Sequence, residues 1–98
     1  MPFSLSRRAV EDMLHIYRTG VADFGADQAE RYQDGLEQTF AFLAEFPFVA
    51  RERTELAHNV RAHAYRSHLV FYRVTDRDVF VLRIRHARED WLSQPDAL

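Results

Sequence analysis

Apolar positions in the first part of the chain recur with the period of an α-helix. Ser6 precedes an apolar stripe with the spacing i, i+3, i+4 and i+7, which consists of Val10, Met13, Leu14 and Tyr17. This spacing places the side chains on one helical face, so we expect that face to pack against a core. Ser6 is the predicted N-cap of this helix, and Gly25, just after Phe24, is its predicted stop.

A second helical stripe follows and consists of Ala29, Tyr32, Leu36, Phe40 and Leu43. Asp27 and Glu30 have the spacing of a capping box, which predicts Asp27 as the N-cap. Pro47 disfavours helical geometry in the residue before it, so this helix should end at or before Phe46. Two helices joined by a short glycine-containing loop are expected to form an antiparallel hairpin.

The rest of the chain has the pattern of β-strands. A short alternating segment stands at 3–6, and three segments rich in β-branched and aromatic residues lie near 60–66, 68–74 and 79–86. The "TDRD" turn should join the last two as a hairpin. The charged segment 47–59 has no clean period and is expected to be a surface loop.

This order of elements predicts one α+β domain that spans 1–98. A short N-terminal strand joins three C-terminal strands in an antiparallel sheet, and the two-helix hairpin packs on one face of that sheet. We expect Trp91, in the C-terminal tail, to pack back onto the domain.

Strand alternation then assigns side chains to the two faces of the sheet. The apolar set expected to face the helices is Val60, Ala62, Ala64, Leu69, Phe71, Phe80, Leu82 and Ile84. The opposite, mixed set is Arg61, His63, Tyr65, Val70, Tyr72, Val79, Val81, Arg83 and Arg85. Arginine and tyrosine are enriched at binding hot spots, so the second set predicts a binding surface for an acidic, partly apolar peptide or a nucleic acid. An ordinary solvated face is the alternative.

Charge and composition sharpen this picture. The net charge is −2, yet residues 58–88 hold seven arginines against Asp76 and Asp78, and all thirteen Lys+Arg residues are arginine. The chain has no cysteine and no long apolar run, which fits a cytoplasmic protein with no membrane segment. No metal-ligand spacing occurs, so neither a metal nor a cofactor is expected.

Four segments together resemble the RelE/ParE toxin superfamily, and its ParE branch in particular. They are "LSRRAVEDMLHIYRTGVADFG", "QAERYQDGLEQTFAFLAEFP", "NVRAHAYRSHLVFYRV" and "VFVLRIRHARED". The resemblance implies the same arrangement of strand, helix hairpin and three strands. It also implies a type II toxin that inhibits DNA gyrase, forms a hetero-oligomer with a ParD-like antitoxin, and is neutralised by the antitoxin's acidic C-terminal segment.

RelE-type relatives cleave mRNA in the ribosome, and this is the alternative function. Such cleavage needs proton-exchanging groups beside phosphate-binding cations, for which Arg61, Arg83, His63 and His86 are the candidates. The chain departs from that pattern because it has no lysine and because Glu89 follows His86 closely. We therefore expect His86 to be structural, bonded to Asp90 or to a backbone carbonyl. A third possibility is a protein of this fold that has lost its toxicity.

We assign no catalytic residue. The residues predicted to bind the antitoxin or the target are Arg61, Tyr65, Tyr72, Arg83, Arg85, His86 and Arg88.

Overall fold

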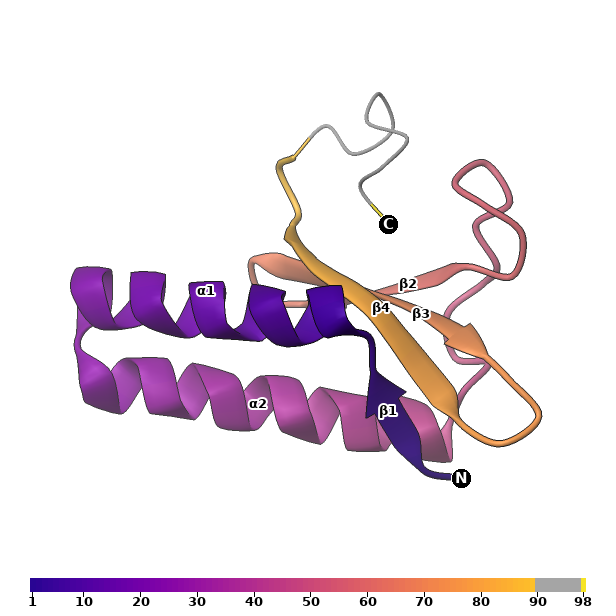
Figure 1. Ribbon diagram of the computed structural model, residues 1–98, viewed down its shortest axis with the longest axis horizontal. Coiled ribbons are helices and arrows are strands. Elements are labelled where there is room, and N and C mark those ends of the chain that lie inside the picture. The colour runs from indigo at the N-terminus through magenta and orange to yellow at the C-terminus, as the bar shows by residue number, and fades with distance from the viewer. Residues whose placement is uncertain (90–97) are drawn as a thin grey trace.

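The computed structural model describes residues 1–89 and residue 98 of the chain. Two helices follow a short strand and precede three longer strands (Figure 1). In chain order the elements are β1 (Phe3–Leu5), α1 (Arg7–Phe24), α2 (Ala26–Glu45), β2 (Arg61–Tyr65), β3 (His68–Val74) and β4 (Val79–His86). All the predicted helices and strands are therefore present. The predicted packing of Trp91 concerns a residue outside those that the structure describes.

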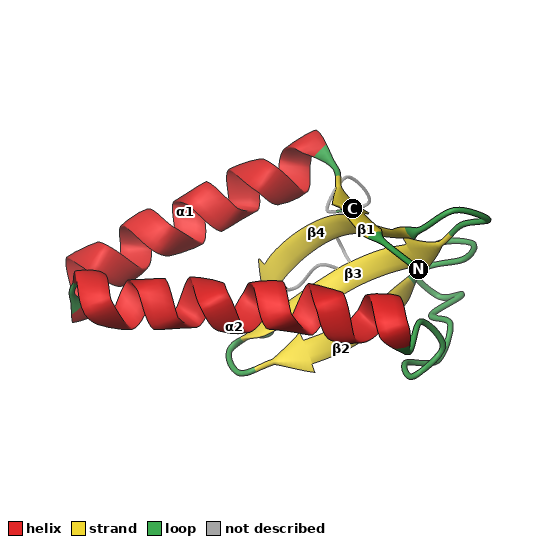
Figure 2. Ribbon diagram, turned by 90° about the horizontal axis from the view of Figure 1, so that it is seen from below, coloured by secondary structure: helices red, strands yellow, loops and turns green. Residues whose placement is uncertain are grey.

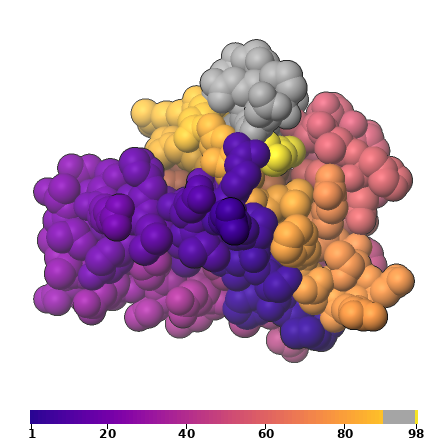
Figure 3. All heavy atoms as spheres, in the orientation of Figure 1, coloured from indigo at the N-terminus to yellow at the C-terminus, as the bar shows by residue number. Residues whose placement is uncertain are grey.

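The strands form one sheet in the order β1-β4-β3-β2. Strands β2, β3 and β4 pair antiparallel, as predicted, whereas β1 pairs parallel with β4, so the sheet is mixed. The two helices form a V that opens from their connecting turn and covers one face of the sheet (Figure 2). The loop after α2 forms a lobe at the end of the molecule remote from that turn (Figure 3).

The ends of the helices follow from local hydrogen bonding. Ser6 is the N-cap of α1, as predicted, and its hydroxyl accepts from the N–H of Ala9 at 3.0 Å. Gly25 ends α1 as predicted, and it is also the N-cap of α2, so the two helices share one connecting residue. The prediction of Asp27 as N-cap is wrong, because α2 already begins at Ala26 and makes no side-chain capping bond. Gly25 has a φ of 89°, which a glycine adopts without steric cost.

The core lies between the helix hairpin and the sheet. Its buried residues are Ala9, Met13, Leu36, Phe40, Leu43, Val70, Tyr72, Val79, Val81 and Ile84. The predicted stripe of α2 is confirmed at Ala29, Leu36, Phe40 and Leu43. The predicted face of α1 is confirmed at Met13, which is buried. It is wrong at Val10 and Leu14, which are about half exposed, because α1 turns Ala9 inward together with Met13.

The predicted division of the sheet into faces is also wrong for β2, β3 and the first part of β4. It holds at the end of β4, where Ile84 is in the core and the neighbouring Arg83 and Arg85 alternate to the other side. Val70, Tyr72, Val79 and Val81 face the helices, although they were assigned to the outer face. The strands β3 and β4 change register between the pairs Tyr72↔Val81 and Phe71↔Arg83. This irregularity leaves Leu82 without a partner in β3 and restarts the alternation, so that Val81 and Ile84 both point inward.

Strand β2 follows the same inverted alternation. Arg61 pairs with Tyr72, and His63 pairs with Val70, so these β2 residues lie on the face that carries the helices. Tyr65 also lies on this face and packs directly against the α2 backbone at Gly35. A Cβ at position 35 would overlap the Tyr65 hydroxyl, so the close approach requires glycine there.

Candidate functional site

A groove of about 970 Å³ opens where the helix hairpin overhangs the ends of β3 and β4. We call it the hairpin groove. It is lined by both helices, by the turn between β2 and β3, and by the end of β4. Four of the predicted site residues contribute to its wall, namely Tyr65, Arg83, Arg85 and His86.

An ion pair joins α1 to β4 in this groove. Arg83 Nε donates to Asp12 Oδ2 at 2.7 Å, and Arg83 Nη2 donates to Asp12 Oδ1 at 3.0 Å. The backbone N–H of Ile84 also donates to Asp12 Oδ2 at 3.0 Å. The two side chains are only 11% and 15% exposed. The hydrogen bonds to Asp12 raise the pKa of Arg83, so its charge is held in a largely buried, two-point pair.

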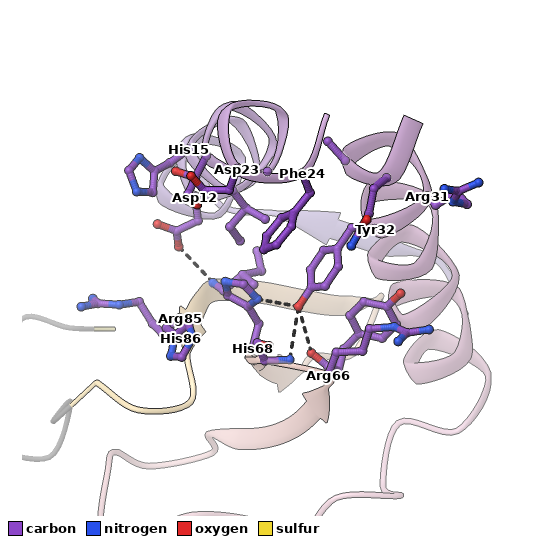
Figure 4. A pocket seen from close by; sticks show the side chains of 18 of the residues that line it. Asp12, His15, Asp23, Phe24, Arg31, Tyr32, Arg66, His68, Arg85 and His86 are labelled. Atoms are coloured by element: carbon purple, nitrogen blue, oxygen red, sulfur yellow. Dashed lines mark hydrogen bonds between the residues drawn. The ribbon is translucent and has the colours of Figure 1, made fainter. Parts of the chain in front are cut away.

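Tyr32 and His68 form a second connection across the groove, between α2 and β3. Their hydroxyl oxygen and Nδ1 are 2.7 Å apart, and the two side chains point toward each other (Figure 4). The N–H of Ser67 donates to the same hydroxyl at 3.3 Å. Burial, and secondarily the neighbouring His86, lowers the pKa of His68, and burial raises the pKa of Tyr32. The pair is therefore best described as neutral on both sides, joined by one hydrogen bond between the hydroxyl and the imidazole.

The end of β4 completes the groove. The rings of His68 and His86 meet edge to face at 5.4 Å. His86 Nδ1 accepts from the backbone N–H of Arg88 at 3.1 Å, so the predicted bond to a carbonyl is replaced by a bond from an amide. The alternative partner, Asp90, lies outside the described residues. Arg85 Nε donates to Glu89 Oε2 at 2.7 Å. This end of the strand therefore supplies its own counter-charge.

A second cluster lies at the opposite end of the sheet, around the start of β2. We call it the β2 patch, and it consists of Phe42, Phe46, Phe48, Arg61 and His63. Phe42 contacts both Phe46 and His63, with ring centroids 5.3 and 5.6 Å apart. The Arg61 guanidinium lies 5.0 Å from the centre of the Phe48 ring.

Arg61 is only partly satisfied in the β2 patch. Its Nη1 donates to the carbonyl of Ala50 at 2.6 Å. Its buried Nε has no hydrogen-bond partner among the described residues. The three phenylalanines of the patch remain 40% (Phe42), 50% (Phe46) and 68% (Phe48) exposed. The patch thus combines uncovered aromatic surface with a guanidinium that is not fully bonded.

The seven predicted binding residues are therefore not one surface. The hairpin groove is lined by Tyr65, Arg83, Arg85 and His86. Arg61 belongs to the β2 patch. Arg88 is exposed, whereas Tyr72 is fully buried. The predicted outer-face position of Tyr72 is wrong, because its ring fills the core and its hydroxyl donates to the Pro47 carbonyl at 2.8 Å. Their proposed role in binding a partner stays a prediction.

Sequence reasoning missed the residues that complete both clusters. Tyr32 had been identified only as part of a core stripe, and His68 had no predicted partner. The two lie 36 positions apart, so no local spacing links them. The exposed phenylalanines carried a weak signal, since Phe46 and Phe48 flank the helix-ending Pro47 in a segment with no apolar period.

Known proteins match the chain over most of its length. The family model described as the ParE toxin of the type II toxin–antitoxin system parDE matches residues 3–91. Toxin ParE1 of Caulobacter vibrioides is 36% identical over 85 residues, which cover 87% of this chain and 88% of that protein. Toxin ParE1 of Mycobacterium tuberculosis is 32% identical over 89 residues, which cover 90% of this chain and 91% of that protein.

A solved structure described as the chromosomal ParDE TA system from P. aeruginosa has the same fold. It superposes with a TM-score of 0.76 at 20% sequence identity, and the match covers 88% of this chain and 95% of that chain. In the part of the chain that the structure describes, no helix is long and apolar enough to cross a membrane.

Proposed function

Because this chain belongs to the family of ParE toxins of type II toxin–antitoxin systems, we propose that it inhibits DNA gyrase in the cytoplasm and is neutralised by a ParD-like antitoxin. The observation that carries this choice over mRNA cleavage is the pairing of Arg83 with Asp12. This pairing determines whether Arg83 is available to bind a phosphate in the hairpin groove.

RNA cleavage requires a cation that is available to the phosphate as negative charge develops on it. In the hairpin groove Arg83 is engaged by Asp12, and Arg85 is engaged by Glu89. Both carboxylates would repel an RNA backbone. Arg61, the other candidate cation, lies in the β2 patch beside Phe48. Tyr32 and His68 could exchange a proton, but the carboxylates of Asp12 and Glu89 nearby disfavour the approach of a phosphate. The groove is therefore poorly suited to RNA cleavage.

The antitoxin part of the proposal is supported by the uneven distribution of positive charge and exposed aromatic side chains over the surface. Residues 58–88 carry an excess of arginine, and the β2 patch leaves three phenylalanines exposed. An acidic segment that is disordered when alone could cover such a surface on folding. Of the predicted binding residues, we assign these contacts first to Arg61 and Arg88, because Tyr72 and Arg83 are buried or largely buried within the fold.

Expression of the chain alone in growing cells tests the proposal. We expect growth arrest with a DNA-damage response, loss of gyrase supercoiling and trapping of gyrase on cleaved DNA. Co-expression of the protein encoded beside this gene should restore growth. Primer extension on translated mRNA serves as the matched readout. Codon-specific cuts within minutes, with gyrase activity unchanged, would establish the ribonuclease alternative instead.

A further inference from the structure

Helix α1 leaves a row of apolar side chains exposed along most of its length. We call this row the α1 stripe, and it consists of Val10, Leu14, Tyr17 and Val21. Leu14 is 51% exposed, Val10 is 48% exposed, and the other two are partly or largely exposed. The buried residues of α1 are Ala9 and Met13, which lie on a different face of the helix. The domain core therefore does not account for the stripe.

The spacing of the α1 stripe is that of a coiled-coil seam. Its four residues follow one another at intervals of four, three and four positions. These are the intervals between the d and a positions of successive heptads, where the side chains of one helix fit between those of another. Val10 and Tyr17 take the d positions, and Leu14 and Val21 take the a positions. The stripe thus fits a second helix that lies along α1.

The charges beside the stripe indicate which helix this is. Glu11 and Arg18 are both exposed, and each follows a d position, so both lie at e positions on the same side of the stripe. In an antiparallel pair of helices, the e positions of the two helices face each other. A second copy of α1 therefore brings Glu11 of each copy beside Arg18 of the other. In a parallel pair the e positions would face Met13 and Gly20 instead, and no ion pair would form.

The apolar side chains match in the same antiparallel arrangement. A two-fold axis that passes between Leu14 and Tyr17 sets Val10 of one copy opposite Val21 of the other. It also sets Leu14 opposite Tyr17. The same surface is thus complementary to itself in both apolar contacts and charge, as a two-fold interface requires.

We propose that two copies of the chain form a symmetric dimer in which their α1 stripes pack antiparallel. This inference does not depend on the proposed function. The 18 residues of α1 give a contact about 27 Å long, which is small for a dimer interface, so dimerisation is concentration-dependent. Asp12 and Thr19, which line the hairpin groove, lie on the opposite side of α1 from the stripe at about 3.6 residues per turn. The dimer therefore leaves the hairpin groove open.

Sedimentation equilibrium of the purified full chain tests the dimer, over about 1–100 μM, where a contact of this size dissociates. Leu14→Glu puts a charge at the centre of the stripe and should weaken dimerisation by about tenfold or more. Glutamate is a good helix former, so this variant should keep the parent circular-dichroism spectrum. Val49→Glu is the matched control, because Val49 is also 51% exposed but lies in the loop after α2. It should dimerise as the parent does.

An exchange of charges tests the antiparallel arrangement without altering the apolar residues. Glu11→Arg sets positive charges against each other across the interface, and Arg18→Glu sets negative charges against each other. Each single variant should weaken dimerisation by about threefold to tenfold. The double variant restores opposite charges and should recover the dissociation constant of the parent. A general loss of folding or solubility would not produce this recovery.

Three results would overturn the inference. The first is a chain that sediments as a monomer over the whole concentration range, even if the protein encoded beside this gene covers the stripe in a complex. The second is a dimer that Val49→Glu disrupts and Leu14→Glu does not, which would place the interface beside the β2 patch. The third is a double charge variant that dimerises no better than either single variant, which would exclude the antiparallel pairing of α1.

Discussion

The hairpin groove and the β2 patch contain the same kinds of side chains but differ in how far those side chains are bonded. In the groove, Arg83 makes a two-point pair with Asp12, and His68 is bonded to Tyr32. In the patch, the Nε of Arg61 has no partner among the described residues, and Phe48 is 68% exposed. Arginine and aromatic residues alone therefore do not identify a binding surface; their unsatisfied bonds and uncovered area do.

The largest expected effect is a difference in the free energy of unfolding between alanine variants of Arg83 and Arg61. Arg83→Ala leaves the Asp12 carboxylate largely buried without its counter-charge, which should lower the free energy of unfolding by about 3–5 kcal/mol. Arg61→Ala loses the bond to Ala50 and the stacking on Phe48, which should cost about 1 kcal/mol. Urea denaturation of both variants measures the difference. Equal costs would contradict the distinction between a structural groove and an interaction patch.

The next effect concerns Tyr65, which lines the hairpin groove at the end of β2 remote from the β2 patch. Gly35→Ala puts a methyl group against the Tyr65 hydroxyl and should destabilise the fold by about 1–3 kcal/mol. In a Tyr65→Ala background the overlap is gone, and the same change should stabilise α2 by up to about 1 kcal/mol. Thermal unfolding of the four proteins gives the coupling. A cost of Gly35→Ala that persists without the Tyr65 ring would show that another contact is responsible.

The smallest effect is a pH dependence with a contribution from each region. Burial lowers the pKa of His68 in the groove and of His63 in the patch below the ordinary value of 6.5. As the pH falls below 6.5, the unfolded chain takes up these protons before the folded chain does, so stability should decrease. At higher pH both states are neutral and the contribution disappears.

Burial is the first cause of the lowered pKa at both histidines; at His68 the neighbouring His86 lowers the pKa further, while Glu89 and Asp12 raise it. Both His68→Asn and His63→Asn should therefore flatten this dependence, and we expect the larger effect at His68, where two imidazoles lie side by side. Asparagine suits the test because its side-chain amide lies near the place of Nδ1 and can still hydrogen-bond the Tyr32 hydroxyl. Unfolding midpoints measured from pH 7.5 down to about pH 5 provide the comparison. A larger flattening from His63→Asn would place the more strongly desolvated imidazole in the patch.

The elements and their order were predictable because they depend on local signals. Ser6 caps α1, and Pro47 stops the chain from continuing as a helix. Which side chains of each element face the core was not predictable from these local signals. On α1, Val10 and Leu14 matched the helical period better than Ala9, yet the small Ala9 is the residue that allows close packing.

The sheet shows the limit of period-two reasoning. One irregularity at Leu82 shifts the alternation within β4, so no single assignment of faces fits the whole strand. The pairing of Asp12 with Arg83 joins residues 71 positions apart, and no spacing along the chain indicates it. The predicted binding residues were thus of the right chemical types, while their bonding depended on contacts that only the fold creates.

The bond from Ile84 N–H to Asp12 has a further consequence for how copies of this chain can associate. Strand β1 pairs with only the first part of β4, and Asp12 occupies an outward amide of β4 beyond it. A sheet that grows by edge-to-edge addition needs two open edges per molecule. Because β1 and Asp12 of α1 occupy the β4 side of the sheet, β2 is the edge left for a further strand. A molecule without its partner can therefore join at most one other copy by strand addition, through β2. Such self-association would end at a pair, so the fold limits fibre growth even while one edge stays available for recognition.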